Sequence, residues 1–378
     1  MNIFIFLTLL NVCYGNNVPF QMYQILGEYF CSYFLGEEKY MVLADIDLIN
    51  DFSMVSNIYY RVPLDSFEHI NTVFYKEKEY KVSQLNDIIT LTKKNVENSI
   101  PKFNFYFVNK EISGPNSLSL SFKYKDNSFS IVHLLFESNL ITKKGFYFGG
   151  GDLIFGNPPT DSKITSMHQA TCKVNNNKEY FDKSSWGCDI NGIYLTNSTI
   201  KPYYNNVYAK FTGINNYIII PESFMKYLND TLFNDLKEFC KYQLLSWTYS
   251  YRCHSSVLKE MQNNLVVVID GVGFEIDKYD MFEFDGFYVN LLFRVRNEIN
   301  NKCNEWDIGT AFLSKYNEYF DYDNKSVTFY SNNPFIILEL KGNSEYKDVK
   351  ICFCLFNINI LIINIIIIAI YQKMWLIK

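Results

Sequence analysis

Two short stretches of the sequence carry residues that could do chemistry. The stretch YMVLADIDLINDF (residues 40–52) runs from an apolar strand into two acids, Asp45 and Asp47, and such a carboxylate can serve as a general base. The stretch KFTGINNYIIIP (residues 210–221) has the pattern of a strand that enters a tight Thr-Gly turn and leaves through an apolar run. Phe211, at the entrance of that turn, can neither accept nor donate a proton. The second stretch therefore lacks the acid that the first one has.

Other catalytic, metal and cofactor signatures are weak. No Gly-x-Ser-x-Gly elbow occurs, and the glycine run at residues 149–151 is not followed by the Lys-Ser or Lys-Thr pair of a phosphate loop. The histidines show no metal-ligand spacing and are interpreted as structural or surface residues: His69, His133, His168 and His254. The tryptophans outside the chain ends are expected in the core: Trp186, Trp247 and Trp306. We expect neither a bound metal nor a cofactor.

The ends of the chain have the composition of targeting and membrane segments. Residues 1–15 are almost wholly apolar and too short to span a bilayer, which predicts a secretory signal peptide cleaved after Gly15. Residues 351–371 carry no charge and are long enough to cross roughly 30 Å of hydrocarbon as a helix, before a short tail at 372–378. Residues 16–350 are then expected in the secretory pathway lumen or at the cell surface, on a single-pass membrane protein.

The segment between these ends is expected to be mainly β and divided into two lobes. Its length is too great for one compact core, and it is rich in Tyr and Phe, which favour strands. The polar, proline-paired stretch GNPPTDSK (residues 156–163) suggests a boundary, with lobes at 16–158 and 159–350. The net charge of −5 gives no reason to expect nucleic acid as a partner.

Short strands bounded by turn residues recur along this segment, and two stretches have a helical pattern. The expected strands lie at residues 38–46, 102–108, 117–124, 145–151, 215–220, 265–276 and 326–330. Within one of them, the Asp270-Gly271 pair predicts a hairpin, because a type I′ turn needs positive φ at both central positions. Helices are expected at 130–141 and at 221–241, where Pro221 suits a helix start.

Cysteines and glycosylation sequons agree with an oxidising compartment. Six cysteines lie between the terminal segments, an even number that suggests disulfides and allows 15 pairings: Cys31, Cys172, Cys188, Cys240, Cys253 and Cys303. Three sequons are candidate glycosylation sites: Asn197, Asn229 and Asn324.

Several motifs, in the same order along the chain, resemble pepsin-family aspartic proteases and especially the plasmepsins. The most specific is WDIGTAFLSKYNEYFDYDNKSVTFY (residues 306–330), which is similar to the closing segment of that family. Further pieces at 117–122, 129–152, 184–195 and 253–276 extend the resemblance over nearly all of residues 16–350. The resemblance implies two β lobes around a central cleft, each lobe delivering one Asp-Thr-Gly loop, and a bond between Cys253 and Cys303. The two carboxylates of such a site share a proton and activate a water against a peptide carbonyl.

Carried onto this sequence, the first loop of that family falls on residues 45–47. Asp45 takes the catalytic position, and Ile46 and Asp47 replace the Thr and Gly. If no deletion is placed after Gly36, Asp47 takes the catalytic role instead. The tyrosine of the flap that closes over the cleft corresponds to Tyr75, and the residues at 76–78 replace the glycines of the flap tip.

The second loop of the family falls on residues 211–213. Thr212 and Gly213 keep their places, but Phe211 stands where the second aspartate belongs. Without a paired acid, Asp45 could act at most as an ordinary general base, and losing one member of such a pair costs several orders of magnitude in rate.

The resemblance therefore implies a membrane-anchored homologue with lost or much reduced peptidase activity. Its cleft would still hold an extended peptide or a partner protein, and the C-terminal helix would hold the membrane. Two alternatives remain: an active aspartic endopeptidase that uses Asp45 with an unidentified second acid, supplied by the same chain or by a second copy, and a structural or adhesive surface glycoprotein. The sequence does not determine the oligomeric state.

Overall fold

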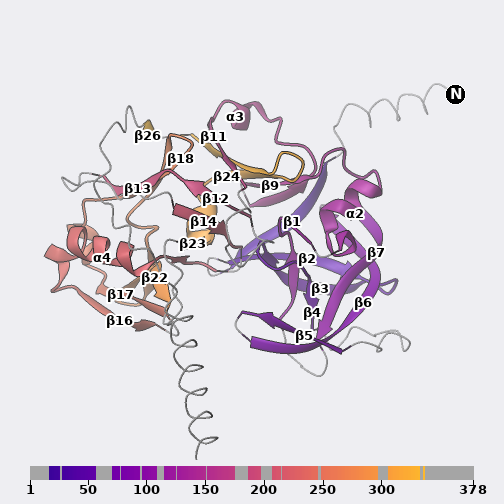
Figure 1. Cartoon of the computed structure of the whole chain (residues 1–378), viewed down its shortest axis with the longest axis horizontal. Coiled ribbons are helices and arrows are strands. Elements are labelled where there is room, and N and C mark those ends of the chain that lie inside the picture. Colours follow the sequence, from indigo (N-terminus) through magenta and orange to yellow (C-terminus); the bar gives the residue numbers. More distant parts are fainter. Residues whose placement is uncertain are drawn as a thin grey trace, which may run out of the picture. The chain divides into compact units, whose positions relative to one another are not determined.

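Strands predominate in the structure, a computed structural model whose described residues all belong to one compact unit. The described residues are 17–25, 28–56, 70–76, 78–93, 96–108, 115–124, 126–149, 151–174, 186–196, 207–213, 215–245, 248–296, 305–332 and 335–336. The helices between the strands are short (Figure 1). The expectation of a mainly β fold is confirmed.

The largest sheet combines strands from both ends of the described chain. Within the described ranges it has 13 strands, in the order β11 (His168–Lys173), β25 (Ser326–Ser331), β24 (Asn317–Asp321), β9 (Gly145–Gly149), β10 (Asp152–Phe155), β1 (Val18–Ile25), β2 (Glu28–Leu35), β3 (Tyr40–Asp47), β8 (Ser117–Ser119), β4 (Met54–Val55), β7 (Val96–Val108), β6 (Lys78–Lys93) and β5 (Ile70–Tyr75). In β2, buried and half-buried residues alternate, as expected for a strand with one face on the core.

Two further sheets are built from the second half of the chain. Among the described residues the larger follows the order β12 (Gly187–Ile190), β14 (Val207–Phe211), β23 (Glu305–Ile308), β15 (Ile218–Ile219), β22 (Phe293–Arg296), β17 (Thr248–His254), β21 (Tyr288–Leu291) and β20 (Phe282–Asp285), and β16 (Cys240–Leu245) pairs with β17. The smaller contains β13 (Gly192–Leu195), β18 (Leu265–Ile269), β19 (Val272–Ile276) and β26 (Phe335–Ile336). Asp270 and Gly271, with φ of 49° and 75°, form the predicted turn between β18 and β19.

The helices agree only in part with the sequence patterns. The described helical segments are η2 (Asn127–Phe129), α2 (Ile131–Glu137), α3 (Ser162–Thr165), α4 (Glu222–Thr231), η3 (Asn234–Leu236), α5 (Val257–Glu260) and α6 (Thr310–Leu313). The predicted helix at 130–141 corresponds to α2, which Ser130 caps. The prediction of one helix over 221–241 is wrong, because α4 ends at Thr231 and β16 begins at Cys240. Phe233 stacks on Tyr251 there, with ring centroids 4.0 Å apart, so burial of that ring outweighs the helical pattern.

An aromatic cluster around Trp186 joins the two halves of the chain. The rings of Phe122 and Tyr322 lie 4.9 and 4.8 Å from Trp186, measured between ring centroids. The Trp186 Nε1–H donates a hydrogen bond of 2.7 Å to the carbonyl oxygen of Leu120. Trp186 and Trp306 are both buried, which confirms the core placement expected for them. Trp247 lies outside the described residues.

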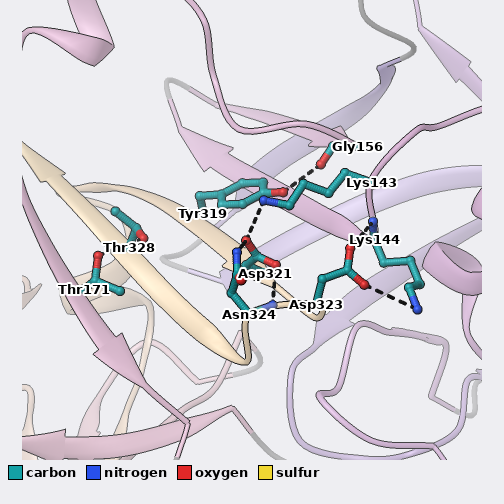
Figure 2. Close-up of polar contacts among 9 residues, drawn as sticks. All are labelled: Lys143, Lys144, Gly156, Thr171, Tyr319, Asp321, Asp323, Asn324 and Thr328. Carbon is teal, nitrogen blue, oxygen red and sulfur yellow. Dashed lines mark hydrogen bonds and ion pairs between the residues drawn. The ribbon is translucent and has the colours of Figure 1, made fainter.

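The β24–β25 hairpin is tied to the segment around β9 by polar contacts (Figure 2). Lys143 Nζ lies 2.7 Å from Asp321 Oδ2, and Tyr319 Oη donates a hydrogen bond of 3.0 Å to the carbonyl of Gly156. Burial raises the pKa of Asp321, but Lys143 and the donors of Asn324 outweigh it, so the pKa is lowered and the carboxylate stays charged. The β24–β25 hairpin is thereby held in one sheet with β9, β10 and the first described strand, β1, across the lobe boundary predicted near residue 158. That boundary stays a prediction.

The predicted terminal segments, at residues 1–15 and 351–371, lie outside the described residues, as does the tail at 372–378. Among the helices that the structure describes, none has the length and apolar character needed to cross a membrane.

Candidate functional site

Strands β3 and β8 position the acids of the first loop, which we define as residues 45–50. β3 runs parallel to β8, with Asp45 paired to Ser117 and Asp47 to Ser119. Alternate residues of a strand point to opposite faces. The buried apolar residues on the other face of β3 are Val42, Ala44 and Ile46. Both candidate acids therefore lie on the face of β3 that turns away from this apolar packing.

Asp47 is fully buried and hydrogen-bonded at both carboxylate oxygens. Its Oδ1 accepts from the backbone N–H groups of Ile49 and Asn50, at 2.8 and 3.1 Å, and its Oδ2 accepts from Asn50 Nδ2 at 2.6 Å. Burial raises the pKa of Asp47 to about 6, although these donors favour the charged form. The carboxyl group can therefore exchange a proton in a mildly acidic medium.

Asp45 is 9 % exposed and is covered by the turn between β5 and β6. Tyr75 Oη donates to Asp45 Oδ2 at 3.0 Å, and Lys76 Nζ lies 2.9 Å from the same oxygen. The Lys76 ammonium is also 3.7 Å from Glu28 Oε2 on β2. The structure thus brings the predicted flap residue Tyr75 together with the predicted acid Asp45.

Strands β14 and β23 position the second loop, of which the structure describes residues 210–213 and 215–217. The Phe211 side chain is fully buried, and its ring centroid lies 5.4 Å from that of Phe329 and 6.4 Å from that of Phe320. Its backbone N–H donates to the carbonyl of Trp186 at 2.8 Å. Phe211 is thus a core residue.

A buried ion pair precedes Phe211 in the second loop. Lys210 Nζ lies 3.2 Å from Asp307 Oδ1 on β23, and the two side chains are only 8 % and 5 % exposed. Lys210 was not predicted as a functional residue, although a lysine in the otherwise apolar strand VYAKF was a signal that it has a buried partner.

The two loops occupy matching places in the strand pairing. Asp45 pairs with Ser117, which also pairs with Met54, nine positions after Asp45. Lys210 pairs with Asp307, which also pairs with Ile219, nine positions after Lys210.

Backbone hydrogen bonds agree with this register. The amides of Asp45 and Thr212 both donate to the parallel partner strand, at Asn116 O (3.0 Å) and Ile308 O (2.9 Å), whereas the Phe211 amide points to the other side. By register, the counterpart of Asp45 is Lys210 and that of Asp47 is Thr212, while Phe211 corresponds to the core residue Ile46. The assignment of Phe211 to a former catalytic position, with Asp45 as its partner, stays a prediction from resemblance.

The two loops meet where Gly213 faces Ile46. A Cβ atom on Gly213 would overlap the carbonyl oxygen of Ile46, so the backbones approach as closely as glycine permits. Thr212, next to this contact, is fully buried. The described carboxylates around the two loops include those of the first loop, Glu28, which lies beside Lys76 and Asp45, and Asp307, which is paired with Lys210.

The disulfides correct one prediction. Cys240 and Cys253 are bonded, and so are Cys172 and Cys188, with Cα atoms 4.0 and 5.9 Å apart. The predicted Cys253–Cys303 bond is wrong, because β16 and β17 pair Cys240 directly opposite Cys253, and this bond uses the Cys253 sulfur. Cys303 lies outside the described residues, and Cys31 is a buried free thiol.

The candidate glycosylation sites differ in environment. Asn324 is exposed in the turn between β24 and β25, where its Nδ2 donates to Asp321 at 2.8 Å. Asn229 is half-buried on α4 and accepts a hydrogen bond of 2.7 Å from Tyr251 Oη. Asn197 lies outside the described residues. Within the described ranges, no group of three or more His, Cys, Asp or Glu side chains could hold a metal ion.

The fold is similar to that of a solved aspartic proteinase from Irpex lacteus. That structure aligns with a TM-score of 0.65 at 14 % sequence identity, over 84 % of this chain and 98 % of the proteinase. The chain has the pepsin-like fold. No protein-family model and no curated protein matches the sequence.

The same pepsin-like fold occurs in two basic 7S globulins. Basic 7S globulin from soybean aligns with a TM-score of 0.64 at 11 % identity, over 83 % of this chain and 94 % of the globulin. Conglutin gamma, a basic 7S globulin from lupine seeds, aligns with a TM-score of 0.63 at 11 % identity, over 84 % of this chain and 96 % of conglutin. The fold alone therefore does not fix an activity, which depends on the residues in the two loops.

Proposed function

We propose that this chain is a secreted, membrane-anchored protein of pepsin-like fold that binds an extended peptide or a partner protein and cleaves peptide bonds very slowly or not at all. One observation carries the proposal. The first loop carries two carboxylates, whereas the sequence of the second, from Lys210 to Pro221, contains no acid. Paired acids that share a proton need one carboxylate from each loop.

The lysine in the second loop strengthens this argument. Lys210 forms a buried ion pair with Asp307 on the neighbouring strand. The Asp307 carboxylate therefore already has a positively charged partner, and we do not expect it to form a dyad with Asp45 or Asp47. Whether Asp45 corresponds to Phe211, as the resemblance implies, or to Lys210, as the strand pairing indicates, the second loop supplies no carboxylate for a catalytic dyad.

The test is a peptidase assay of the full-length protein in detergent micelles, on a mixed peptide library between about pH 3 and pH 7. We expect turnover at least about a thousandfold below that of an active aspartic proteinase assayed in parallel, because losing one member of a catalytic unit costs several orders of magnitude. Cleavage that disappears in both Asp45→Asn and Asp47→Asn would contradict the proposal.

One observation favours a second candidate, a slow acid-dependent peptidase. The pKa of Asp47, raised by burial to about 6, is suited to a general base in a mildly acidic compartment. In that case Asp47→Asn abolishes cleavage and Asp45→Asn does not, which separates the two candidate acids.

Membrane anchoring and lumenal placement rest on the terminal segments of the sequence. Expressed in eukaryotic cells, the full chain should remain with membranes after carbonate washing. It should also lose mass on treatment with an N-glycosidase, and Asn324→Gln should remove part of that loss because Asn324 is exposed. A soluble, unglycosylated product would contradict this part of the proposal.

A further inference from the structure

The hairpin formed by β20 and β21 ends in a group of exposed aromatic rings. The two strands are joined through Phe287 and Gly286, which has the positive φ of 63° that a tight turn requires. Phe284, Phe287 and Tyr288 are 61 %, 81 % and 46 % exposed. We call residues 284–288 the aromatic tip. Apolar side chains gathered on an exposed surface mark a place of contact, whereas single exposed ones need no explanation.

The aromatic tip projects from the surface on which the rest of the hairpin packs. A strand packed on a core has every second residue buried, and β21 follows this rule at Val289 and Leu291. All residues from 284 to 288 are exposed, so neither face of the hairpin is covered there. Phe284 lies opposite Val289, and Tyr288 lies opposite Asp285, which places the rings on both faces. The tip can therefore enter a soft medium without first uncovering a core.

The one acid in the aromatic tip is balanced by a base. Arg252 Nη2, on β17, donates to Asp285 Oδ2 at 2.8 Å. The same guanidinium lies over the Tyr288 ring, 4.7 Å from its centroid. Tyrosine and arginine both place apolar atoms below a polar end group, which suits the headgroup level of a bilayer. The negative charge of Asp285 therefore does not oppose a contact between the phenyl rings and lipid.

The area of the aromatic tip is too small for a stable protein partner. A fully covered aromatic side chain buries about 150–250 Å², so these three partly exposed rings offer less than about 500 Å². Each partner in a stable protein complex buries about 800 Å². Insertion into a membrane interface needs no complementary surface, because its strength scales with the apolar area that enters. The tip therefore fits a bilayer better than a second copy of the chain or a partner protein.

The length of chain beyond the last described strand keeps the folded unit near a bilayer. β26 ends at Ile336, and the apolar segment expected to span the membrane begins at residue 351. Residues 337–350 join the two, and a stretch of this length reaches at most about 50 Å. A contact that is weak in a free protein becomes effective when a tether raises its local concentration. A small apolar tip is then sufficient to hold one face of the unit against the lipid.

We infer that the aromatic tip inserts into the headgroup region of a phospholipid bilayer and so determines which face the folded unit turns toward the membrane. This contact is additional to the proposed function, and it rests on that function only for the tether that keeps the bilayer close. A single shallow lipid contact is weak and reversible, so the tip and the C-terminal segment act as two separate membrane signals.

The test is quenching of tryptophan fluorescence by phosphatidylcholine with brominated acyl chains, on the full-length protein in vesicles of that lipid. The variants are Phe287→Trp and, as a matched control, Phe136→Trp, which replaces an exposed ring on α2. The wild type, which has four tryptophans of its own, gives the baseline. We expect the tryptophan added at position 287 to lose more than about half of its emission relative to unbrominated vesicles, because an interfacial ring enters about 5–10 Å deep. The one added at position 136 should lose less than about a tenth.

A second comparison shows whether the phenyl rings drive the insertion. In a Tyr288→Trp protein, the added tryptophan should be quenched in the same way. Adding Phe284→Ser and Phe287→Ser should reduce that quenching at least about threefold, because most of the apolar area of the tip is then gone. Equal quenching with and without the two phenyl rings would overturn the inference.

Two further results would also overturn it. In one, the tryptophan at position 287 is quenched no more than the one at position 136. In the other, it is unquenched and chemical cross-linking finds a dimer that Phe287→Ser abolishes, so that a second copy covers the tip.

Carbonate washing of the same vesicles separates this contact from the proposed membrane anchor. If the protein resists the wash and position 287 is unquenched, the anchor stands and the contact of the tip fails. If the protein is washed off but position 287 is quenched before the wash, the contact stands and the anchor fails.

Discussion

The loop after β3 and the loop after β14 hold matching places in the strand pairing, yet they carry opposite chemistry. The first places Asp45 and Asp47 on the face away from the core, and the second places Lys210 and Thr212 there. Both keep a large apolar residue pointing the other way, Ile46 in the first loop and Phe211 in the second. The positions that pack have kept apolar residues in both loops, whereas those that would do chemistry differ.

The largest effect expected from this comparison is that of Phe211→Asp. The change removes a buried ring and leaves a carboxylate among Phe320 and Phe329, at a cost of more than about 5 kcal/mol, which is comparable to the whole stability of many domains. We expect no folded protein, as judged by thermal melting and gel filtration. Thr212→Asp, one residue along, should cost less because Thr212 already carries a polar group. If Phe211→Asp folds as well as Thr212→Asp, the register that makes Lys210 and Thr212 the counterparts of the two acids is wrong.

The next effect concerns the buried pair of the second loop. Lys210→Met removes the ammonium that lies 3.2 Å from Asp307, which is 4 % exposed, and removing one partner of a buried pair costs about 3–5 kcal/mol. The double variant Lys210→Met with Asp307→Leu should recover most of this loss. Urea unfolding of the two single variants and the double variant measures the coupling. A coupling below about 1 kcal/mol would show that the two charges do not depend on each other.

A smaller effect, confined to the first loop, appears as a pH dependence. Asp47 has an ordinary pKa of 3.8, and burial raises it to about 6 in the folded protein, so the unfolded chain ionises first as the pH rises. The stability contributed by the neutral acid is therefore complete below about pH 4 and is lost by about pH 6, a fall of up to about 3 kcal/mol. Asp47→Asn should remove this fall, as measured by urea unfolding at pH 4 and pH 7.

That measurement needs a protein in which Glu318, another buried acid, cannot titrate. Both oxygens of Glu318 are buried and have no hydrogen-bond partner among the described residues, and burial raises the pKa of Glu318 well above its ordinary value. Glu318→Gln should therefore accompany every variant, with the exposed Glu260→Gln as a control that changes little. If Asp47→Asn leaves the pH dependence unaltered in this background, Asp47 is not neutral in the folded protein at low pH.

The smallest effect tests the contact between the loops. Gly213→Ala places a Cβ against the carbonyl of Ile46, and one loop must shift, at a cost of about 1–3 kcal/mol. The change in melting temperature measures it, with Gly271→Ala as a comparison in which a Cβ meets no other atom but φ is positive. A Gly213→Ala variant as stable as the wild type would show that the loops do not touch.

The strands could be predicted from the sequence because their signals are local. The Asp270-Gly271 turn depends on alternation and turn residues within a few positions, and the structure contains it. The end of α4 could not be predicted, because it depends on Phe233 meeting Tyr251, which comes from a strand of its own. The same holds for the partner of Cys253, which is fixed by the pairing of β16 with β17.

The candidate site was harder to predict for a related reason. The sequence indicated Asp45, Asp47 and Tyr75, but a slip of one residue in a strand moves every side chain to the other face. Whether Phe211 or Thr212 occupies the position that corresponds to an acid of the first loop depends on which residue of β14 pairs with Asp307. No local sequence pattern contains that information. The Lys76 contact with Asp45 likewise joins segments about thirty residues apart.

The two described disulfides have a consequence for how the protein responds to a reductant. They join Cys172 to Cys188 and Cys240 to Cys253, so each encloses a short stretch of the chain. Closing a stretch of about 15 residues removes about 3 kcal/mol of disorder from the unfolded chain. Dithiothreitol should therefore lower the free energy of unfolding of the compact unit that carries both loops, so the protein is expected to be more durable in an oxidising compartment than in a reducing one.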